Sequence, residues 1–133
     1  MGLLLAMMSE LAGHGARISF EGRLSQTELI GIDGVSFEEK RKLVREGISS
    51  PPLDFLVLPL TSPTIPKIEK AIVSKIGFSY EEIVHIQIEK DGLIAFGAYD
   101  GFNQECVIAS SAISIALLTQ LVRDKVLESY FAV

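Results

Sequence analysis

The stretch IVHIQIEKDGLIAFGAY, from Ile83 to Tyr99, decides the fold that the sequence predicts. Both halves are rich in β-branched and aromatic residues, which favour strands, and the Asp91-Gly92 pair between them favours a type I′ turn. We therefore predict a β-hairpin of Ile83–Glu89 with Leu93–Tyr99.

The register of this hairpin follows if the turn contains only Asp91 and Gly92. Bulky residues then face small ones, with Ile88 opposite Ala95 and Ile86 opposite Gly97, and this face suits close packing of a helix. A longer turn would shift the register and remove this prediction. The other face is half polar and half apolar, so it is either covered by a helix or offered to a partner. Its predicted side chains are His85, Gln87, Glu89, Ile94, Phe96 and Ala98.

The segment before the hairpin predicts a strand followed by a helix. LDFLVLPL, Leu53–Leu60, is apolar at nearly every position, as in strands that are covered on both faces. Ser62 or Thr64 then caps a helix whose early prolines fit the first turn, and the helix ends at Gly77. With the strand at Ile83, this order predicts a right-handed β-α-β crossover with two parallel strands.

The N-terminal part adds further elements. Leu3–Leu11 reads as an apolar helix that ends at the glycines of GHG. ARISFEGRL alternates apolar with polar residues, which predicts a strand with one buried and one wet face, and Glu28–Ile32 reads as a second strand. SFEEKRKLVREG, Ser36–Gly47, begins with a capping box, which predicts a helix.

The C-terminal part predicts a strand in ECVIA and a final helix. Ser110 or Ser111 caps that helix, which runs to about Leu127. The whole pattern predicts an α+β fold of the α/β-sandwich type. Its mixed sheet has Leu53–Leu60 at the centre, one right-handed β-α-β crossover, a C-terminal β-hairpin and about four helices. The predicted core contains Phe20, Phe55, Val57, Ile72, Ile86, Ile88, Leu118 and Val122.

Length and composition indicate a single globular domain, residues 1–133. The hydrophobic share of 48% is typical of a folded chain. The apolar run LLLAMM is much shorter than the roughly 20 residues of a membrane helix and lacks the features of a signal peptide. The single cysteine, Cys106, fits a reducing compartment, so we expect a cytoplasmic protein.

Candidate catalytic residues have simpler structural interpretations. His85 shares a strand face with Glu89 and could be a general base, but a surface or interface histidine is commoner. His14 lies between two glycines, where it can interact with a helix end. Cys106 follows Glu105, whose carboxylate disfavours a thiolate, so a small core residue is the better interpretation. We expect no catalysis, metal or cofactor, because the histidines and the cysteine lack ligand spacing.

No nucleotide-binding motif occurs, since GHG follows a helix rather than a strand. The basic residues of KRKLVR could contact phosphates, but glutamates flank them and the chain carries a net charge of −5. We interpret KRKLVR as a solvated helix face and expect no nucleic-acid partner.

Acidic residues gather around the hairpin. Tyr80 to Glu105 holds six acidic residues and one base, so its net charge of −5 equals that of the chain. Such charges either solubilise a sheet edge or attract a basic protein while aromatic residues anchor it. The predicted partner-binding residues are Glu81, Glu82, Glu89, Asp91, Phe96, Tyr99, Asp100, Phe102 and Glu105.

LDFLVLPL followed by IVHIQIEKDGLIAFGAYDGFNQECV resembles the small cytoplasmic immunity proteins encoded beside polymorphic or contact-dependent bacterial toxins. The resemblance covers about a third of the chain and implies stoichiometric blocking of a toxin or nuclease without catalysis. It transfers no individual binding residue.

Two alternatives belong to other classes. One is a small-molecule-binding α/β domain or minor enzyme with a pocket near Thr61–Thr64, since ligands often bind at strand ends beside a helix N-terminus. The other is an oligomeric scaffold protein, for example a homodimer.

Overall fold

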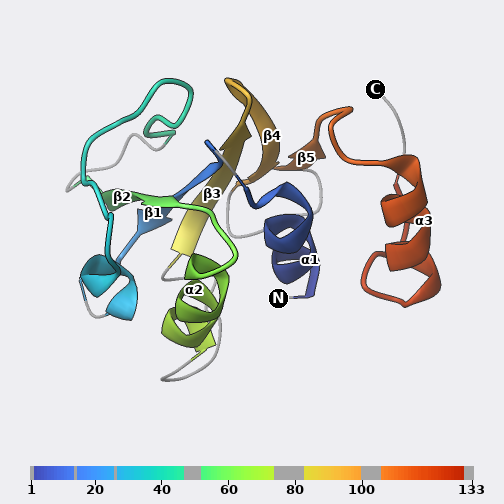
Figure 1. The fold of residues 1–133 in the computed structure, drawn as a ribbon, viewed down its shortest axis with the longest axis horizontal. Helices are drawn as coiled ribbons and strands as arrows, with labels where there is room; N and C mark the ends of the chain where they lie inside the picture. Colours follow the sequence, from blue (N-terminus) through green and yellow to red (C-terminus); the bar gives the residue numbers. More distant parts are fainter. Residues whose placement is uncertain are drawn as a thin grey trace.

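The computed structural model describes residues 2–13, 15–25, 27–46, 52–73, 83–99 and 106–130. Helices lie against an open five-stranded sheet with the strand order β2-β1-β3-β4-β5, so the fold is α+β (Figure 1). The elements in chain order are α1 (Gly2–Leu11), β1 (Arg17–Gly22), the 3₁₀ helix η1 (Glu28–Gly31), β2 (Asp54–Pro59), α2 (Thr64–Val73), β3 (Ile83–Lys90), β4 (Leu93–Ala98), β5 (Val107–Ala109) and α3 (Ile115–Arg123).

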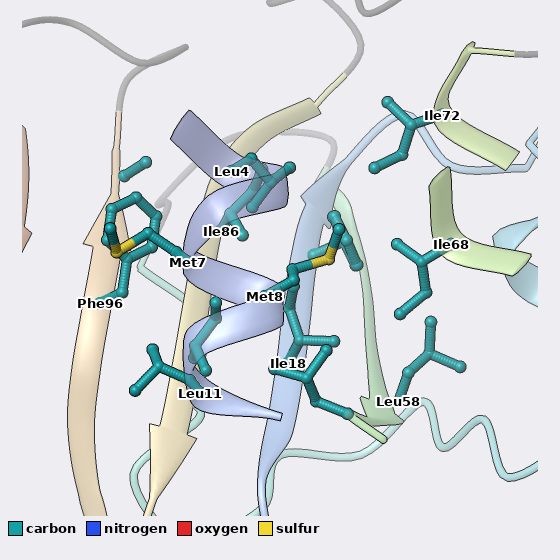
Figure 2. Packing of buried hydrophobic residues seen from close by; sticks show 14 of the residues in the cluster. Leu4, Met7, Met8, Leu11, Ile18, Leu58, Ile68, Ile72, Ile86 and Phe96 are labelled. Carbon is teal, nitrogen blue, oxygen red and sulfur yellow. The ribbon is translucent and has the colours of Figure 1, made fainter. Parts of the chain in front are cut away.

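The main hydrophobic core lies between the sheet and α1 and α2. Helix α1 is apolar on most sides, and its Leu4, Met7 and Met8 have no exposed surface. Figure 2 shows Met7 beside Phe96 of β4 and Met8 on the side of Ile68 of α2. Burying such side chains supplies about 1.5–3 kcal/mol each, which makes this layer the main source of stability.

Most of the predicted core is confirmed, but not its C-terminal part. Leu118 and Val122 are only partly buried, whereas Leu121 is 6% exposed. Helix α3 also begins later than predicted, since Ser114 caps it and not Ser110 or Ser111. The remaining six predicted residues are all buried: Phe20, Phe55, Val57, Ile72, Ile86 and Ile88.

The arrangement of the strands differs from the predicted one. Every pair of neighbouring strands is antiparallel, so the predicted mixed sheet is wrong. Strand β2 lies at one end of the strand order instead of at its centre. Strands β2 and β3 each run antiparallel to β1 between them, so they point the same way without pairing. The right-handed crossover is not confirmed, since residues 74–82 lie outside the described residues.

The predicted hairpin is present as β3 and β4. Asp91 and Gly92 have φ angles of 54° and 78°, as a type I′ turn requires. The predicted register holds for the pair Glu89 and Ile94, after which a bulge shifts it. Ile88 therefore pairs with Phe96 and not with Ala95. Strand β5 extends this hairpin, so the strand predicted in ECVIA is confirmed.

Three local predictions are wrong. Strand β1 is buried on both faces, because Ser19 and Glu21 are as inaccessible as their apolar neighbours. Glu28–Gly31 forms a 3₁₀ helix and not a strand. Residues 36–46 are not helical, since Ser36 exchanges two backbone hydrogen bonds with Val57 of β2. The described residues thus contain three α-helices and one 3₁₀ helix, so about four helices are not confirmed.

Within the described ranges, every helix is too short or too polar to cross a membrane.

Candidate functional site: a buried polar layer under a basic strap

Polar side chains of β1 and β3 line the face of the sheet opposite the main core. They come from alternate positions, so they point to one side of the sheet. Cross-strand register brings Ser19 opposite Gln87 and Glu21 opposite His85. Each side chain is at most 8% exposed. We call this set the polar layer: Ser19, Glu21, His85, Gln87 and Glu89.

A segment of the same chain, residues 36–46, covers part of this face and is called the strap. One end is fixed at the outer edge of β2, where the N–H of Ser36 donates to the carbonyl of Val57 over 2.9 Å. Leu43 is fully buried against Phe55 and Val57, with Ile94 beside them. These four residues form a second, smaller core, which explains why β2 is buried on both faces as its sequence predicted.

The strap turns sharply at its middle. Lys40 and Leu43 exchange two backbone hydrogen bonds, of 3.0 Å and 2.8 Å, which brings Arg41 and Lys42 to the tip. Arg41 has a φ of 52°, in the left-handed region that only glycine enters without cost. The turn leaves the side chains of Arg41 and Lys42 exposed.

Two buried carboxylates hold the backbone of the strap. Glu89 Oε2 accepts the N–H of Lys42 over 3.0 Å, and Glu21 Oε1 accepts the N–H of Glu46 over 2.8 Å. The guanidinium of Arg17 lies 4.0 Å from the other oxygen of Glu89. A buried carboxylate is costly unless such donors and charges compensate it, so these contacts are what allows Glu21 and Glu89 to stay inside.

Gln87 connects the strap to the end of β4. Its amide nitrogen donates to Oε1 of Glu46 over 2.9 Å and to the hydroxyl of Tyr99 over 3.1 Å. Its amide oxygen accepts from the hydroxyl of Ser19 over 3.3 Å. In the described part of the chain, every buried side-chain nitrogen and oxygen has a hydrogen-bond partner.

Tyr99 can reach Gln87 because Gly97 has no side chain. A Cβ at Gly97 would lie 2.6 Å from the Tyr99 hydroxyl, which is closer than real contacts allow. The Tyr99 ring also lies beside His85, with the ring centroids 5.8 Å apart. The positions of Gly97, Tyr99 and Gln87 are therefore coupled.

The predicted partner-binding residues fall into three groups. Asp91 is exposed at the hairpin turn and Tyr99 is partly buried. Glu89 and Phe96 are inside the protein, at 2% and 1% exposure, because the strap covers the first and the bulge in β4 turns the second into the main core. The others lie outside the described residues: Glu81, Glu82, Asp100, Phe102 and Glu105.

Other candidates from the sequence are placed as follows. Thr64 is 9% exposed, and its hydroxyl donates to the Pro59 carbonyl over 2.8 Å and accepts the N–H of Thr61 over 2.9 Å. The polar groups of Thr61–Thr64 thus fix the start of α2. Cys106 is partly buried, and its carbonyl accepts the N–H of Tyr99. His14 lies outside the described residues, among which no group of three His, Cys, Asp or Glu side chains could hold a metal ion.

Sequence reasoning missed Glu21 and Glu46 as members of this site. The signal for Glu21 was its alternation with Phe20, which we interpreted as a wet strand face. Glu46 had no such signal, because its segment predicted a helix.

No known protein family, curated protein or solved structure matches this chain.

Proposed function

We propose that this protein is a non-catalytic binding domain of the immunity type, which binds and blocks a positively charged toxin or nuclease domain. The observation that supports this proposal best is the contact between the polar layer and the strap. Glu21 and Glu89 already accept backbone N–H groups of a segment that carries Lys40, Arg41, Lys42 and Arg45. The sheet therefore has the chemistry to hold a basic polypeptide segment.

The charge of the whole chain favours the same class of partner. The chain has a net charge of −5, while the strap has four bases and three acids, so the rest carries −6. Such a charge speeds the approach of a basic protein and slows that of an acidic one. Exposed Asp91 at the hairpin turn and partly buried Tyr99 at the other end of β4 remain in this proposal as partner contacts.

A growth assay tests the proposal. The product of the neighbouring open reading frame should arrest the growth of a test bacterium, and coexpression of this protein should restore growth. The two products should also copurify as a stoichiometric complex without tags. If the neighbouring product is harmless, or if it remains toxic in the presence of this protein, the immunity proposal is wrong.

A second candidate function is the binding of a small charged molecule. A shallow depression of about 570 Å³ lies between η1 and α2, and Lys67, Lys70, Glu28 and Asp33 line it. Charges of both signs at one depression suit a zwitterionic ligand. Mass spectrometry of the protein denatured after gentle purification would detect a retained metabolite, and self-association alone would favour the scaffold alternative.

A further inference from the structure

The strap has a conformation that opposes its own sequence. SFEEKRKLVRE contains a capping box and strong helix formers, which favour a helix that begins at Ser36. One capping hydrogen bond is present but long, because Ser36 Oγ accepts the N–H of Glu38 over 3.4 Å. The rest of the segment is not helical, and Arg41 takes a left-handed φ. Natural sequences rarely contain a segment whose local preference conflicts with its folded conformation. Where such a conflict occurs, it is often at a functional element.

Tertiary contacts outweigh this local preference at a few points. They are the burial of Leu43, the pairing of Ser36 with Val57, and the carboxylate bonds to the N–H groups of Lys42 and Glu46. The strap lies apart from the main core, because Leu43 belongs to the smaller cluster with Phe55 and Val57. The apolar contact of the strap thus belongs to a small cluster that is separate from the main core, although β2 takes part in both.

We propose that the strap is a displaceable occupant of the polar layer, and that a basic extended segment of the partner replaces it. This inference rests on the proposed function and names the surface that the partner uses. The charges that would receive the segment are Glu21 and Glu89, and the contacts of the strap indicate which groups it must supply. These are two backbone N–H donors and an apolar residue for the site of Leu43, while the charge of the two carboxylates favours basic side chains beside them.

Charge complementarity favours a basic segment over an acidic or neutral one. When the strap leaves, Glu89 loses the N–H of Lys42 and keeps only Arg17 at 4.0 Å, while Glu21 loses the N–H of Glu46. An incoming acidic segment would place further negative charge beside both carboxylates. A basic segment restores the compensation that buried carboxylates require.

A labelled peptide with the sequence of residues 36–46 provides the probe. Fluorescence anisotropy would measure its affinity for the full-length protein, in which it must compete with the strap itself. Leu43→Ala weakens the docked strap, so this variant should bind the peptide about tenfold more tightly than the parent. Arg41→Gly relieves the left-handed residue and lowers helix propensity, so it should bind about fivefold more weakly. Arg23→Gly, at an exposed arginine outside the strap, is the matched control and should equal the parent.

The outcomes separate this inference from the proposed function. Equal affinities in all four proteins, or equal binding of a scrambled peptide of the same composition, would overturn the displacement of the strap. If Leu43→Ala does not fold, hydrogen exchange at the amides of Lys42 and Glu46 decides. Arg41→Gly should slow it about fivefold, and an unchanged rate overturns the inference. If the strap variants rescue growth from the toxin as well as the parent does, the displacement of the strap is wrong and the immunity function stands. If the protein does not rescue growth but the peptide affinities are as expected, the immunity function is wrong and the displacement stands.

Discussion

At the scale of single residues, Gly97 is required by a neighbour and not by its own backbone. Its missing side chain leaves the space in which the Tyr99 ring lies, and the Tyr99 hydroxyl accepts from Gln87. One glycine in a strand, which costs stability by itself, therefore allows a hydrogen bond at the centre of the polar layer.

Gly97→Ala should displace the Tyr99 ring and lower the free energy of unfolding by about 1–3 kcal/mol, because the partly buried hydrogen bond to Gln87 is lost. Urea denaturation would measure this change. In a Tyr99→Ala background the same substitution should cost much less, since the obstructing ring is gone. Equal costs in both backgrounds would mean that Gly97 does not act through Tyr99.

Glu89 and Asp91 are two residues apart and should respond differently to substitution. Glu89→Ala leaves the N–H of Lys42 without its acceptor and should lower the free energy of unfolding by about 1–3 kcal/mol. Asp91→Asn changes an exposed charge and keeps a residue type that tolerates a positive φ, so its effect should stay below about 0.5 kcal/mol. Thermal unfolding compares them, and similar effects would contradict the buried position of Glu89.

At the scale of elements, the sequence predicted α1, β1, α2 and the β3–β4 hairpin, because apolar periodicity and turn residues agree there. It did not predict which strands are neighbours, since the pairing of β1 with β3 depends on contacts between distant segments. The strap was mispredicted for a related reason. Its local preference for a helix is real, but Leu43 and Ser36 make long-range contacts that no local pattern encodes. For the candidate site, the sequence indicated that His85, Gln87 and Glu89 share one face of β3. It did not indicate that the strap covers part of this face.

Val57 joins β2 to both the sheet and the strap. It is 3% exposed, and its backbone pairs with Ser36. Val57→Asp would bury an unpaired charge in the smaller core and should lower the free energy of unfolding by roughly 3–5 kcal/mol. Ile108→Asp in the edge strand β5 is the matched control, because Ile108 is 55% exposed and should change stability little. A Val57→Asp protein that melts like this control would show that the strap does not cover β2.

At the scale of the whole molecule, the two faces of the sheet differ in the chemistry of the segments that cover them. Apolar side chains of α1 and α2 cover one face, and a charged strap over the polar layer covers part of the other. The apolar side contains the main core, and the polar side contains the contacts that the proposed displacement would replace. Sequence composition alone could not assign these roles, because charge and apolar residues alternate along the same strands.

The electrostatic part of the proposed function has its own test. Asp91→Lys changes an exposed charge at the hairpin end and should slow association with the identified partner severalfold at low salt, with little change in the melting temperature. The difference should shrink in high salt, because the Debye length is about 10 Å at 0.1 M and about 3 Å at 1 M. Surface plasmon resonance at both salt concentrations measures it. An association rate that is unchanged at low salt would mean that the hairpin end does not guide the partner.

The pairing of Ser36 with Val57 also has a consequence for solubility. It occupies backbone groups on the outer edge of β2, an edge strand whose residues Phe55 to Leu58 are all apolar. Unpaired apolar strand edges are templates for other chains and for cross-β aggregation. Displacement of the strap would therefore expose the outer edge of β2, which can pair with other chains, as well as the carboxylates of Glu21 and Glu89. Protein whose strap has opened should aggregate, so the docked strap protects β2 from pairing with other chains.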